Sequence, residues 1–385
     1  MLIVRSPVRI SFAGGGTDLP AYFERFGGAV LSAAINKYFY TIVGKRSDSH
    51  IQIISSDLRV FETWEDIHSM SARGTPLEIP VAVLKELGCE KAVDLFLASE
   101  IPPGTGLGSS ASVCVNVLQA MAAYLHLPFS KNELAEKAYD IATRVLGQPV
   151  GKQDEYAAAF GGLNLMTFHR DGSTGIEPLT LEPEFVTALQ QKLMLFFTGA
   201  AHHSWSILKE QEAATQLGEH MALESLHRIK ALVREMYEAI LARDLETFGQ
   251  LLHEGWENKK KLSSGISSPA IDRLYAIACD QGARGGKITG AGGGGFLLLF
   301  CEEEFQPAVR RALAAEGIKE MRFTFEFQGC RILVDDPFLD ADGNGLAESV
   351  QAVLHPRISA RSHGVAEPQP RLAADPRHAG TGFRR

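Results

Sequence analysis

The sequence has few cysteines and no long apolar segment. Its apolar runs are too short to cross a membrane, and its N-terminus has no charged start followed by a long apolar stretch. The five cysteines are scattered without a CxxC pair, so we expect neither a disulfide framework nor a cysteine-based zinc site. These features predict a cytoplasmic protein with reduced thiols at Cys89, Cys114, Cys279, Cys301 and Cys330.

An excess of positive charge is also missing. The 385 residues include 38 Lys and Arg against 46 Asp and Glu, which gives a formal net charge of −8. This balance argues against nucleic acid as the main partner. With 45% apolar and 22% charged residues, the chain has the composition of a globular protein that is long enough for two domains. We expect no membrane partner, while composition leaves the oligomeric state open.

Lysine is absent from the place where a common nucleotide-binding loop needs it. Residues 102–112 read PPGTGLGSSAS, and two serines follow Gly108 where a Walker A loop has lysine. Glycines let backbone N–H groups approach a ligand, and the unpaired N–H groups and dipole of a helix start favour an anion. We predict a phosphate-binding loop rather than a simple N-cap. The candidate nucleotide-binding residues are Pro103, Gly104, Gly106, Leu107, Gly108, Ser109, Ser110, Ala111 and Ser112.

The pattern of apolar residues predicts an α+β chain. Short runs rich in β-branched and aromatic residues predict strands at 1–12, 28–43, 50–54, 91–99, 163–168, 193–197, 296–300 and 321–327. Longer periodic runs predict helices at 109–125, 131–146, 204–217, 219–242, 244–261, 269–281 and 307–316. Ser130 and Glu133 have the spacing of a capping box. Helix 109–125 is apolar on nearly every side and should be buried.

The character of the sequence changes twice along the chain. The first part mixes strands and helices, whereas the part after about residue 190 is mostly helical. From about Asp336 the sequence is rich in Pro, Arg, His and Gly and has almost no apolar periodicity. We therefore expect domains at 1–190 and 191–335 and a mostly disordered tail at 336–385.

Two patterns that suggest metal sites fail on closer inspection. His202 and His203 are adjacent, so their side chains diverge, and no third ligand has a suitable spacing. Residues 340–345, DADGNG, begin like a calcium loop, but position 12 is Gln351. We interpret the first as a substrate-facing or surface pair and the second as a turn.

Charged residues near the glycine motifs are candidates for catalysis. In the segment GKQDEY, Lys152 stands two residues before Asp154, and a nearby cation would keep this carboxylate ionised and able to accept a hydroxyl proton. A surface salt bridge is the alternative. Arg9 lies in an apolar strand and so needs a phosphate or a carboxylate as partner. Asp18 follows three glycines and is suited either to bind substrate hydroxyls or to form an Asx turn or a helix cap.

A second glycine-rich segment occupies residues 290–295. Gly290, Gly292 and Gly295 match GxGxxG, but a strand follows where a dinucleotide-binding motif requires a helix. We favour a second loop that closes the phosphate site over a tight crossing of loop and sheet.

Three motifs stand in a fixed order: RISFAGGGTD at 9–18, PGTGLGSSAS at 103–112 and KITGAGGGG at 287–295. In this order they resemble the GHMP kinases, the superfamily of galactokinase, homoserine kinase, mevalonate kinase and phosphomevalonate kinase. The resemblance covers roughly residues 1–335. The stretches 151–164 and 261–300 are most similar to the group that acts on D-glycero-D-manno-heptose 7-phosphate.

The resemblance implies a two-domain GHMP kinase fold, with a ribosomal protein S5 domain 2-like N-terminal domain, a ferredoxin-like C-terminal domain, and ATP and Mg²⁺ between them. It implies that Ser110 binds Mg²⁺, that Asp154 takes the sugar hydroxyl proton, and that Arg9 supports this site. We add Lys152 to the catalytic set. The sugar would contact Asp18, Gly15, Gly16, Thr17, Gly292 and Gly293.

The chain departs from the family pattern in two places. Ala142 and Thr143 stand where a Glu about eleven or twelve residues before the catalytic Asp completes the Mg²⁺ site, and Asp140 or Glu136 are the candidate substitutes. The segment 199–206 also lacks the Arg that the group tends to carry there. Three hypotheses follow: a kinase for the anomeric hydroxyl of heptose 7-phosphate, a kinase for another sugar such as fucose or galactose, and a non-catalytic nucleotide- or sugar-binding regulator.

Overall fold

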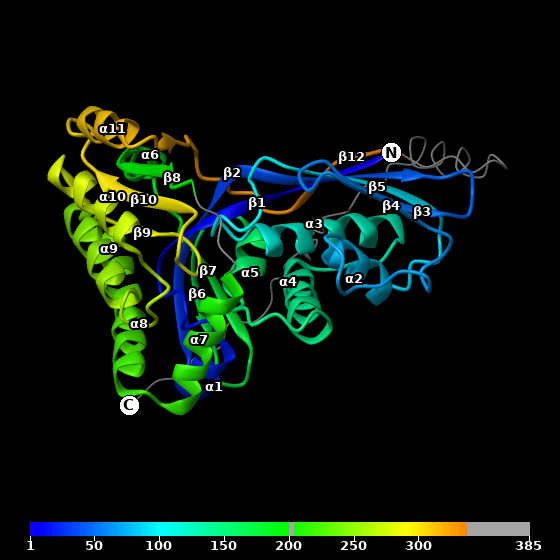
Figure 1. Ribbon diagram of the computed structural model, residues 1–385, viewed down its shortest axis with the longest axis horizontal. Helices are drawn as coiled ribbons and strands as arrows, with labels where there is room; N and C mark the ends of the chain where they lie inside the picture. The colour runs from blue at the N-terminus through cyan, green and yellow to red at the C-terminus, as the bar shows by residue number, and fades with distance from the viewer. Residues whose placement is uncertain (200–203, 337–385) are drawn as a thin grey trace, which may run out of the picture. The chain divides into compact units, whose positions relative to one another are not determined.

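The structure is a computed structural model that describes residues 1–199 and 204–336 (Figure 1). The predicted tail from 337 onward, including the turn at 340–345, lies outside these residues, as do His202 and His203. Within the described ranges, no helix combines the length and apolar character needed to cross a membrane.

An eight-stranded sheet is built around two long antiparallel strands. β1 (Leu2–Ala13) pairs with β2 (Gly28–Lys45), and β2 is long enough to pair with β6 through its first half and with β5 through its second half. The main path of the sheet is β12-β1-β2-β5-β3-β4, and β7 pairs with β6. The remaining strands are β3 (Ile51–Ser55), β4 (Val60–Trp64), β5 (Val93–Ser99), β6 (Leu163–Phe168), β7 (Thr174–Pro178) and β12 (Arg331–Asp335).

Helices pack on one face of this sheet, with α3 (Ser109–Tyr124) against β1 and β2 (Figure 1). Eleven residues of α3 are buried, as its apolar pattern predicts. The capping box at Ser130 and Glu133 is confirmed, and it starts α4. The helix predicted for 131–146 ends early, because a short π-helix follows α4. These elements are α1 (Pro20–Phe26), α2 (Glu78–Glu86), α4 (Lys131–Asp140), the π-helix Ile141–Val145 and α5 (Gln153–Phe160).

A second sheet has the order β11-β8-β10-β9. All six residues of β10 (Phe296–Cys301) are buried, since one face packs toward β1, α8 and α9 and the other toward α10 and α11. The same core cluster therefore reaches from the first sheet to the second. The other elements are α6 (Pro183–Gln191), β8 (Leu193–Phe197), α7 (Ser204–Leu217), α8 (His220–Leu241), α9 (Leu245–Lys259), α10 (Pro269–Asp280), β9 (Ala283–Ile288), α11 (Gln306–Ala315) and β11 (Lys319–Glu320).

The predicted strand at 321–327 is wrong. The chain leaves the second sheet after Glu320, and residues 321–327 contain only an isolated bridge between Phe325 and Ile35. Their backbone crosses β2 instead, where the Asn36 N–H donates to the Thr324 carbonyl at 2.9 Å. The alternating apolar residues Met321, Phe323 and Phe325 pack into the core cluster between the two sheets, and they do not pair in a strand ladder.

Candidate active site

One pocket gathers the motifs that are far apart in the sequence. It has a volume of about 670 Å³. Its wall includes the glycine turn after β1, the loop before α3, the first turns of α3 and α5, part of α7, the end of α9 and residues 290–291. We take this pocket as the candidate active site.

The N-terminus of α3 opens on the pocket without a side-chain cap. Gly108, the residue before the helix, is left-handed (φ 77°, ψ 28°). Helical bonding begins at Ser112, whose N–H donates to the Gly108 carbonyl at 3.0 Å. The N–H groups of Ser109, Ser110 and Ala111 therefore have no intrahelical acceptor, and these three residues line the pocket. This geometry suits an anionic group such as a phosphate.

Loop 104–108 lies directly against the second glycine-rich loop. A Cβ atom on Gly106 would lie 2.4 Å from the Thr289 carbonyl oxygen, and one on Gly290 would lie 2.5 Å from Gly106 Cα. Both glycines have positive φ. Only glycine allows the two backbones to approach this closely. The crossing brings Gly290 and Ala291 into the pocket wall.

Arg9 and Asp154 form an ion pair in the pocket wall. Arg9 Nε donates to Asp154 Oδ1 at 2.6 Å, and Arg9 Nη2 donates to Oδ2 at 2.7 Å. Arg9 Nη1 donates to the Gly106 carbonyl at 2.6 Å. The Arg9 side chain is 4% exposed and that of Asp154 is 26% exposed. The partner that Arg9 requires is thus a carboxylate, and the two-pronged contact fixes the direction in which Asp154 faces.

The Asp18 carboxylate lines the pocket and accepts hydrogen bonds from two other segments of the wall. The Gly16 N–H donates to Asp18 Oδ1 at 2.8 Å, while the backbone N–H and Nε2 of Gln153 donate to Oδ2 at 3.3 and 3.1 Å. Burial, and then the charge of Asp154, raise the pKa of Asp18. The alternatives of an Asx turn and a helix cap are wrong, because Pro20 has no N–H to donate and Leu19 is the N-cap of α1.

Two buried lysines beside the pocket were missed by the sequence analysis. Lys259 lines the pocket, and its Nζ donates to the Gly290 carbonyl. Burial, with a smaller effect of Arg9, lowers the pKa of Lys259 to about 8. Lys287 Nζ donates to the Phe12 carbonyl at 3.4 Å, and burial followed by repulsion from Lys259 lowers the pKa of Lys287. Two features of the sequence could have drawn attention to these lysines. Lys259 begins a run of three lysines, and Lys287 is the first residue of the third motif.

Glu155 was also missed, although it lies next to Asp154 in the same motif. It belongs to the first turn of α5, is 2% exposed and lines the pocket. Within the described residues, its Oε2 has no hydrogen-bond partner. Burial, and then the charge of Asp154, raise the pKa of Glu155 well above its ordinary value.

The predicted binding residues divide into two groups. The pocket wall contains Gly15, Gly16, Asp18, Gly104, Gly106, Gly108, Ser109, Ser110 and Ala111. The residues that do not line it are Thr17, Pro103, Leu107, Ser112, Gly292 and Gly293.

Three of the six residues in the second group have structural contacts instead. The Leu107 side chain belongs to the hydrophobic core, and the Ser112 hydroxyl lies 2.9 Å from that of Ser6. The Thr17 hydroxyl donates to the Gly14 carbonyl at 2.8 Å. Each glycine motif therefore contains residues that hold the loop in place in addition to residues that can contact a ligand.

The expected contact between Lys152 and Asp154 is wrong. Lys152 Nζ donates to both carboxylate oxygens of Glu136, at 2.8 and 2.9 Å, and to the Gly172 carbonyl at 2.7 Å. Lys152 does not line the pocket. The cation beside Asp154 is Arg9.

Comparison with known proteins identifies the family. The GHMP kinase N-terminal domain matches residues 77–162, and the GHMP kinase C-terminal domain matches residues 236–319. Over 85% of its length, the chain is 32% identical to the D-glycero-alpha-D-manno-heptose 7-phosphate kinase of Campylobacter jejuni, of which it covers 97%. The chain is a GHMP kinase.

Two further relatives support this assignment. A crystal structure of a D-glycero-D-manno-heptose 1-phosphate kinase from Bacteroides thetaiotaomicron matches with a TM-score of 0.74 and 29% identity, over 87% of this chain and 100% of that one. The L-fucokinase/L-fucose-1-P guanylyltransferase of Bacteroides fragilis is 30% identical over 83% of this chain, which spans 37% of that protein. The expected two-domain GHMP kinase fold is confirmed, and this kinase family uses ATP.

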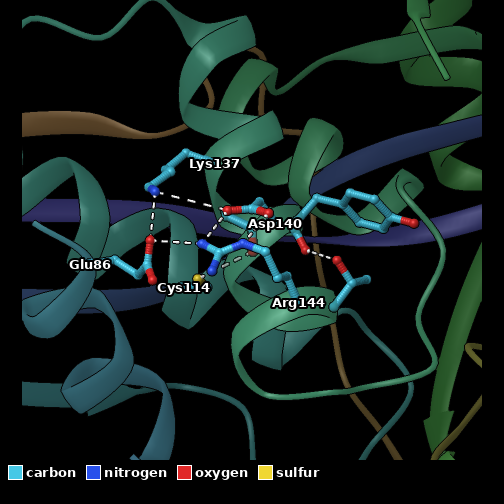
Figure 2. A network of polar contacts seen from close by, with 8 residues as sticks. Glu86, Cys114, Lys137, Asp140 and Arg144 are labelled. Atoms are coloured by element: carbon cyan, nitrogen blue, oxygen red, sulfur yellow. Dashed lines mark hydrogen bonds and ion pairs between the residues drawn. The ribbon is translucent and has the colours of Figure 1, made fainter.

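The Glu that completes the Mg²⁺ site in the family pattern is missing from this GHMP kinase, and Asp140 and Glu136 were the candidate substitutes. Neither residue lines the pocket. Asp140 accepts two hydrogen bonds from Arg144, both at 2.9 Å, in a network with Lys137 (Figure 2). Glu136 is bound by Lys152. The pocket wall at this place is formed by Ala142, in the π-helix that follows α4.

Proposed function

We propose that this GHMP kinase transfers the γ-phosphoryl group of ATP to the anomeric O1 of D-glycero-D-manno-heptose 7-phosphate. The observation that carries the proposal is the single pocket in which the Arg9–Asp154 pair stands beside the open N-terminus of α3. The relative from Campylobacter jejuni, which the chain matches over nearly its whole length, supports the choice of sugar.

In this mechanism Asp154 is the base. Arg9 holds both carboxylate oxygens, so Asp154 is oriented before the substrate arrives. As O1 forms its bond to the γ-phosphorus, the O1 proton passes to Asp154, and the bond from the γ-phosphorus to the bridging oxygen breaks to release ADP. The backbone N–H groups of Ser109, Ser110 and Ala111 stabilise charge on the phosphates.

Unpaired polar atoms around Asp18 support a ligand with several hydroxyl groups. Gln211 Nε2 and Gln153 Oε1 are buried without a hydrogen-bond partner among the described residues, and both side chains line the pocket. A donor and an acceptor left unpaired in this way each cost about 1–3 kcal/mol. Sugar hydroxyls, which both donate and accept, would satisfy them together with Asp18.

Lys209 is our candidate for contacting the sugar phosphate. It is an exposed residue of α7 that lines the pocket. A cation from this helix would compensate for the Arg that the segment 199–206 lacks.

Mg²⁺ completes the proposed reaction mixture. The Ser110 hydroxyl at the start of α3 is suited to contact it, and no group of three or more His, Cys, Asp or Glu side chains forms a protein-only metal site in residues 1–199 and 204–336. This fits Mg²⁺, which takes few protein ligands beside nucleotide phosphates. When bound, it would neutralise charge on the β- and γ-phosphates. Use of ATP and five free thiols support a cytoplasmic location.

The fucokinase relative supports a second candidate, a kinase for an unphosphorylated sugar such as fucose. Phosphorus NMR of reactions with ATP, Mg²⁺ and either heptose 7-phosphate or a panel of neutral sugars separates the candidates. We expect a new anomeric phosphate resonance with heptose 7-phosphate and little product with fucose or galactose. Product only from a neutral sugar would replace the heptose assignment. Nucleotide binding without ADP release from any sugar would favour a regulator.

A further inference from the structure

The Glu155 carboxyl group is buried at the pocket wall with an unsatisfied oxygen. Its side chain lines the pocket, the residue is 2% exposed, and Oε2 lacks a hydrogen-bond partner among the described residues. Leaving a carboxylate oxygen buried and unpaired is costly. A cation or a hydrogen-bond donor bound in the pocket at this place would satisfy the oxygen and stabilise its charged form.

The protein's nearby cations are used elsewhere. Arg9 directs Nε and Nη2 to Asp154 and Nη1 to the Gly106 carbonyl. Lys152 binds Glu136, and neither residue lines the pocket. Two carboxylates are thus adjacent in the first turn of α5. Asp154 is bound by Arg9, whereas Glu155 Oε2 has no partner among the described residues.

Glu155 lines the same pocket wall as Ser110, in the first turn of α3, and Ala142 of the π-helix. Cys114 lines this pocket as well, and the charge of Glu155 contributes, after burial, to the raised pKa values of Cys114 and Tyr139. Cys114 is four residues after Ser110 and shares its helix face, while Tyr139 is three residues before Ala142. The Glu155 side chain therefore shares a pocket wall with Ala142, which stands where the family pattern has its metal-binding Glu.

We propose that Glu155 is a Mg²⁺ ligand of this kinase and takes over the role of the carboxylate missing at Ala142. The proposal rests on the proposed function, because the metal is the one that accompanies ATP. Mg²⁺ is commonly bound by one or two carboxylates together with substrate phosphates, so Glu155, the Ser110 hydroxyl and the triphosphate form a sufficient set of oxygen ligands. Asp154 remains the base, and Glu155 is a second carboxylate with a separate task.

Metal binding itself provides the test. Mn²⁺ replaces Mg²⁺, and electron paramagnetic resonance measures free Mn²⁺ during titration of the full-length protein with a non-hydrolysable ATP analogue present. The variants are Glu155→Gln, the double variant Ala142→Glu/Glu155→Gln, and Asp140→Asn as a matched carboxylate control outside the pocket wall. Binding of the same analogue in EDTA and thermal unfolding are measured on each variant.

We expect Glu155→Gln to weaken Mn²⁺ binding by about tenfold or more, since loss of even an outer-shell partner costs about 10–100-fold. Analogue binding in EDTA should stay within twofold. The double variant should recover most of the Mn²⁺ affinity, and Asp140→Asn should keep all of it. Unchanged Mn²⁺ affinity in folded Glu155→Gln, or an equal loss of analogue binding in EDTA, would overturn the proposal. If Glu155→Gln does not fold, failure of the folded double variant to bind Mn²⁺ overturns it. A wild-type protein that binds no nucleotide even in EDTA would instead overturn the proposed function.

Discussion

At the scale of single residues, the site depends on the fork of two hydrogen bonds from Arg9 to Asp154. Asp154 lies close enough to Asp18 and Glu155 to raise the pKa of both. Without Arg9, three neighbouring carboxyl groups would disfavour one another's charge. A planar guanidinium can satisfy both oxygens of Asp154 at once, and the ammonium of a lysine cannot reproduce this geometry.

Asp154→Asn is expected to lower kcat by about 10²–10⁴-fold, because the amide cannot accept the sugar hydroxyl proton. Coupled measurement of ADP release with ATP and heptose 7-phosphate gives the rate. Asp280→Asn, at an exposed site at the end of α10, is the matched control and should leave the rate unchanged. Full turnover by the Asp154 variant would remove Asp154 from its assigned role.

Lys259→Met should change how stability depends on pH. Burial lowers the pKa of Lys259 from 10.5 to about 8, so between these values the unfolded chain binds more protons than the folded one, and stability rises with pH. The variant lacks this contribution, which amounts to about 3 kcal/mol across the window. It should therefore be more stable than wild type below pH 8, and the difference should disappear as pH approaches 10.5.

Denaturant unfolding across this pH range measures the effect. Lys287, whose pKa is also lowered, contributes a rise of the same sign in both proteins. Lys85→Met, at an exposed position of α2, should keep the wild-type dependence. If the unfolding free energy changes with pH in the same way in wild type and Lys259→Met, the pKa of Lys259 is not lowered by folding.

The sequence predicts which residues are chemically demanding, but not their partners. Arg9 clearly required a counter-charge, yet Asp154 is 145 positions away, and only the fold brings them together. Lys152 was the obvious neighbour of Asp154 in the sequence, but residues two apart at a helix start do not face each other. Glu155 was passed over because a carboxylate next to a candidate base gives no local sign that it is buried.

At the scale of elements, the two glycine-rich loops form one unit. The loop before α3 and the loop before β10 cross with their backbones in contact at Gly106 and Gly290. The position of the α3 N-terminus therefore depends on the second sheet as well as the first. The first loop alone predicts a phosphate site, but only the pair explains why both must be rich in glycine.

Gly106→Ala tests this crossing. The new Cβ would approach the Thr289 carbonyl oxygen to 2.4 Å in a backbone with φ 79°, so both strain and overlap are introduced. Gly74→Ala is the matched control, because Gly74 has φ 80° and nothing within 4 Å of its Cβ position. We expect the control to cost about 1–2 kcal/mol of unfolding free energy and Gly106→Ala about 1–3 kcal/mol more.

Gly106→Ala should weaken ATP binding as well as lower the unfolding free energy. Nucleotide titration measures the first effect and chemical denaturation the second. Equal stability losses in the two alanine variants would mean that the loops separate easily.

Strongly patterned elements could be predicted from the sequence, and weakly patterned ones could not. α3, α8 and β10 have long apolar or amphipathic patterns, which burial then explains. Strands β4 and β7 have no fully buried residue, so their patterns are weak. The π-helix after α4 was invisible, because it is short and ends the helical run, so no later turns reveal the shift in apolar phase.

At the scale of the whole molecule, the chain closes its first sheet with its last described strand. β12 pairs with β1 through Leu2, Ile3, Val4 and Arg5, and the Asp336 N–H donates to the Met1 carbonyl at 3.0 Å. One core cluster also contains residues of β1, α8 and β10. The boundary near residue 190 stays a prediction, and a fragment 1–190 would lack β12 and also α8 and α9, which contact β1.

Two truncations separate the parts of the C-terminus. Residues 1–336 form one compact unit that contains the whole pocket wall, so a chain ending at Asp336 should keep the wild-type unfolding temperature and kinase rate. A chain ending at Cys330 lacks β12 and should lose roughly 2–3 kcal/mol, since several ladder hydrogen bonds are each worth about 0.5–1.5 kcal/mol. Thermal unfolding and ADP release are measured on both. Because β1 also carries Arg9, the shorter chain should lose activity before it unfolds globally, whereas loss of activity in the longer one would assign a role to residues 337–385.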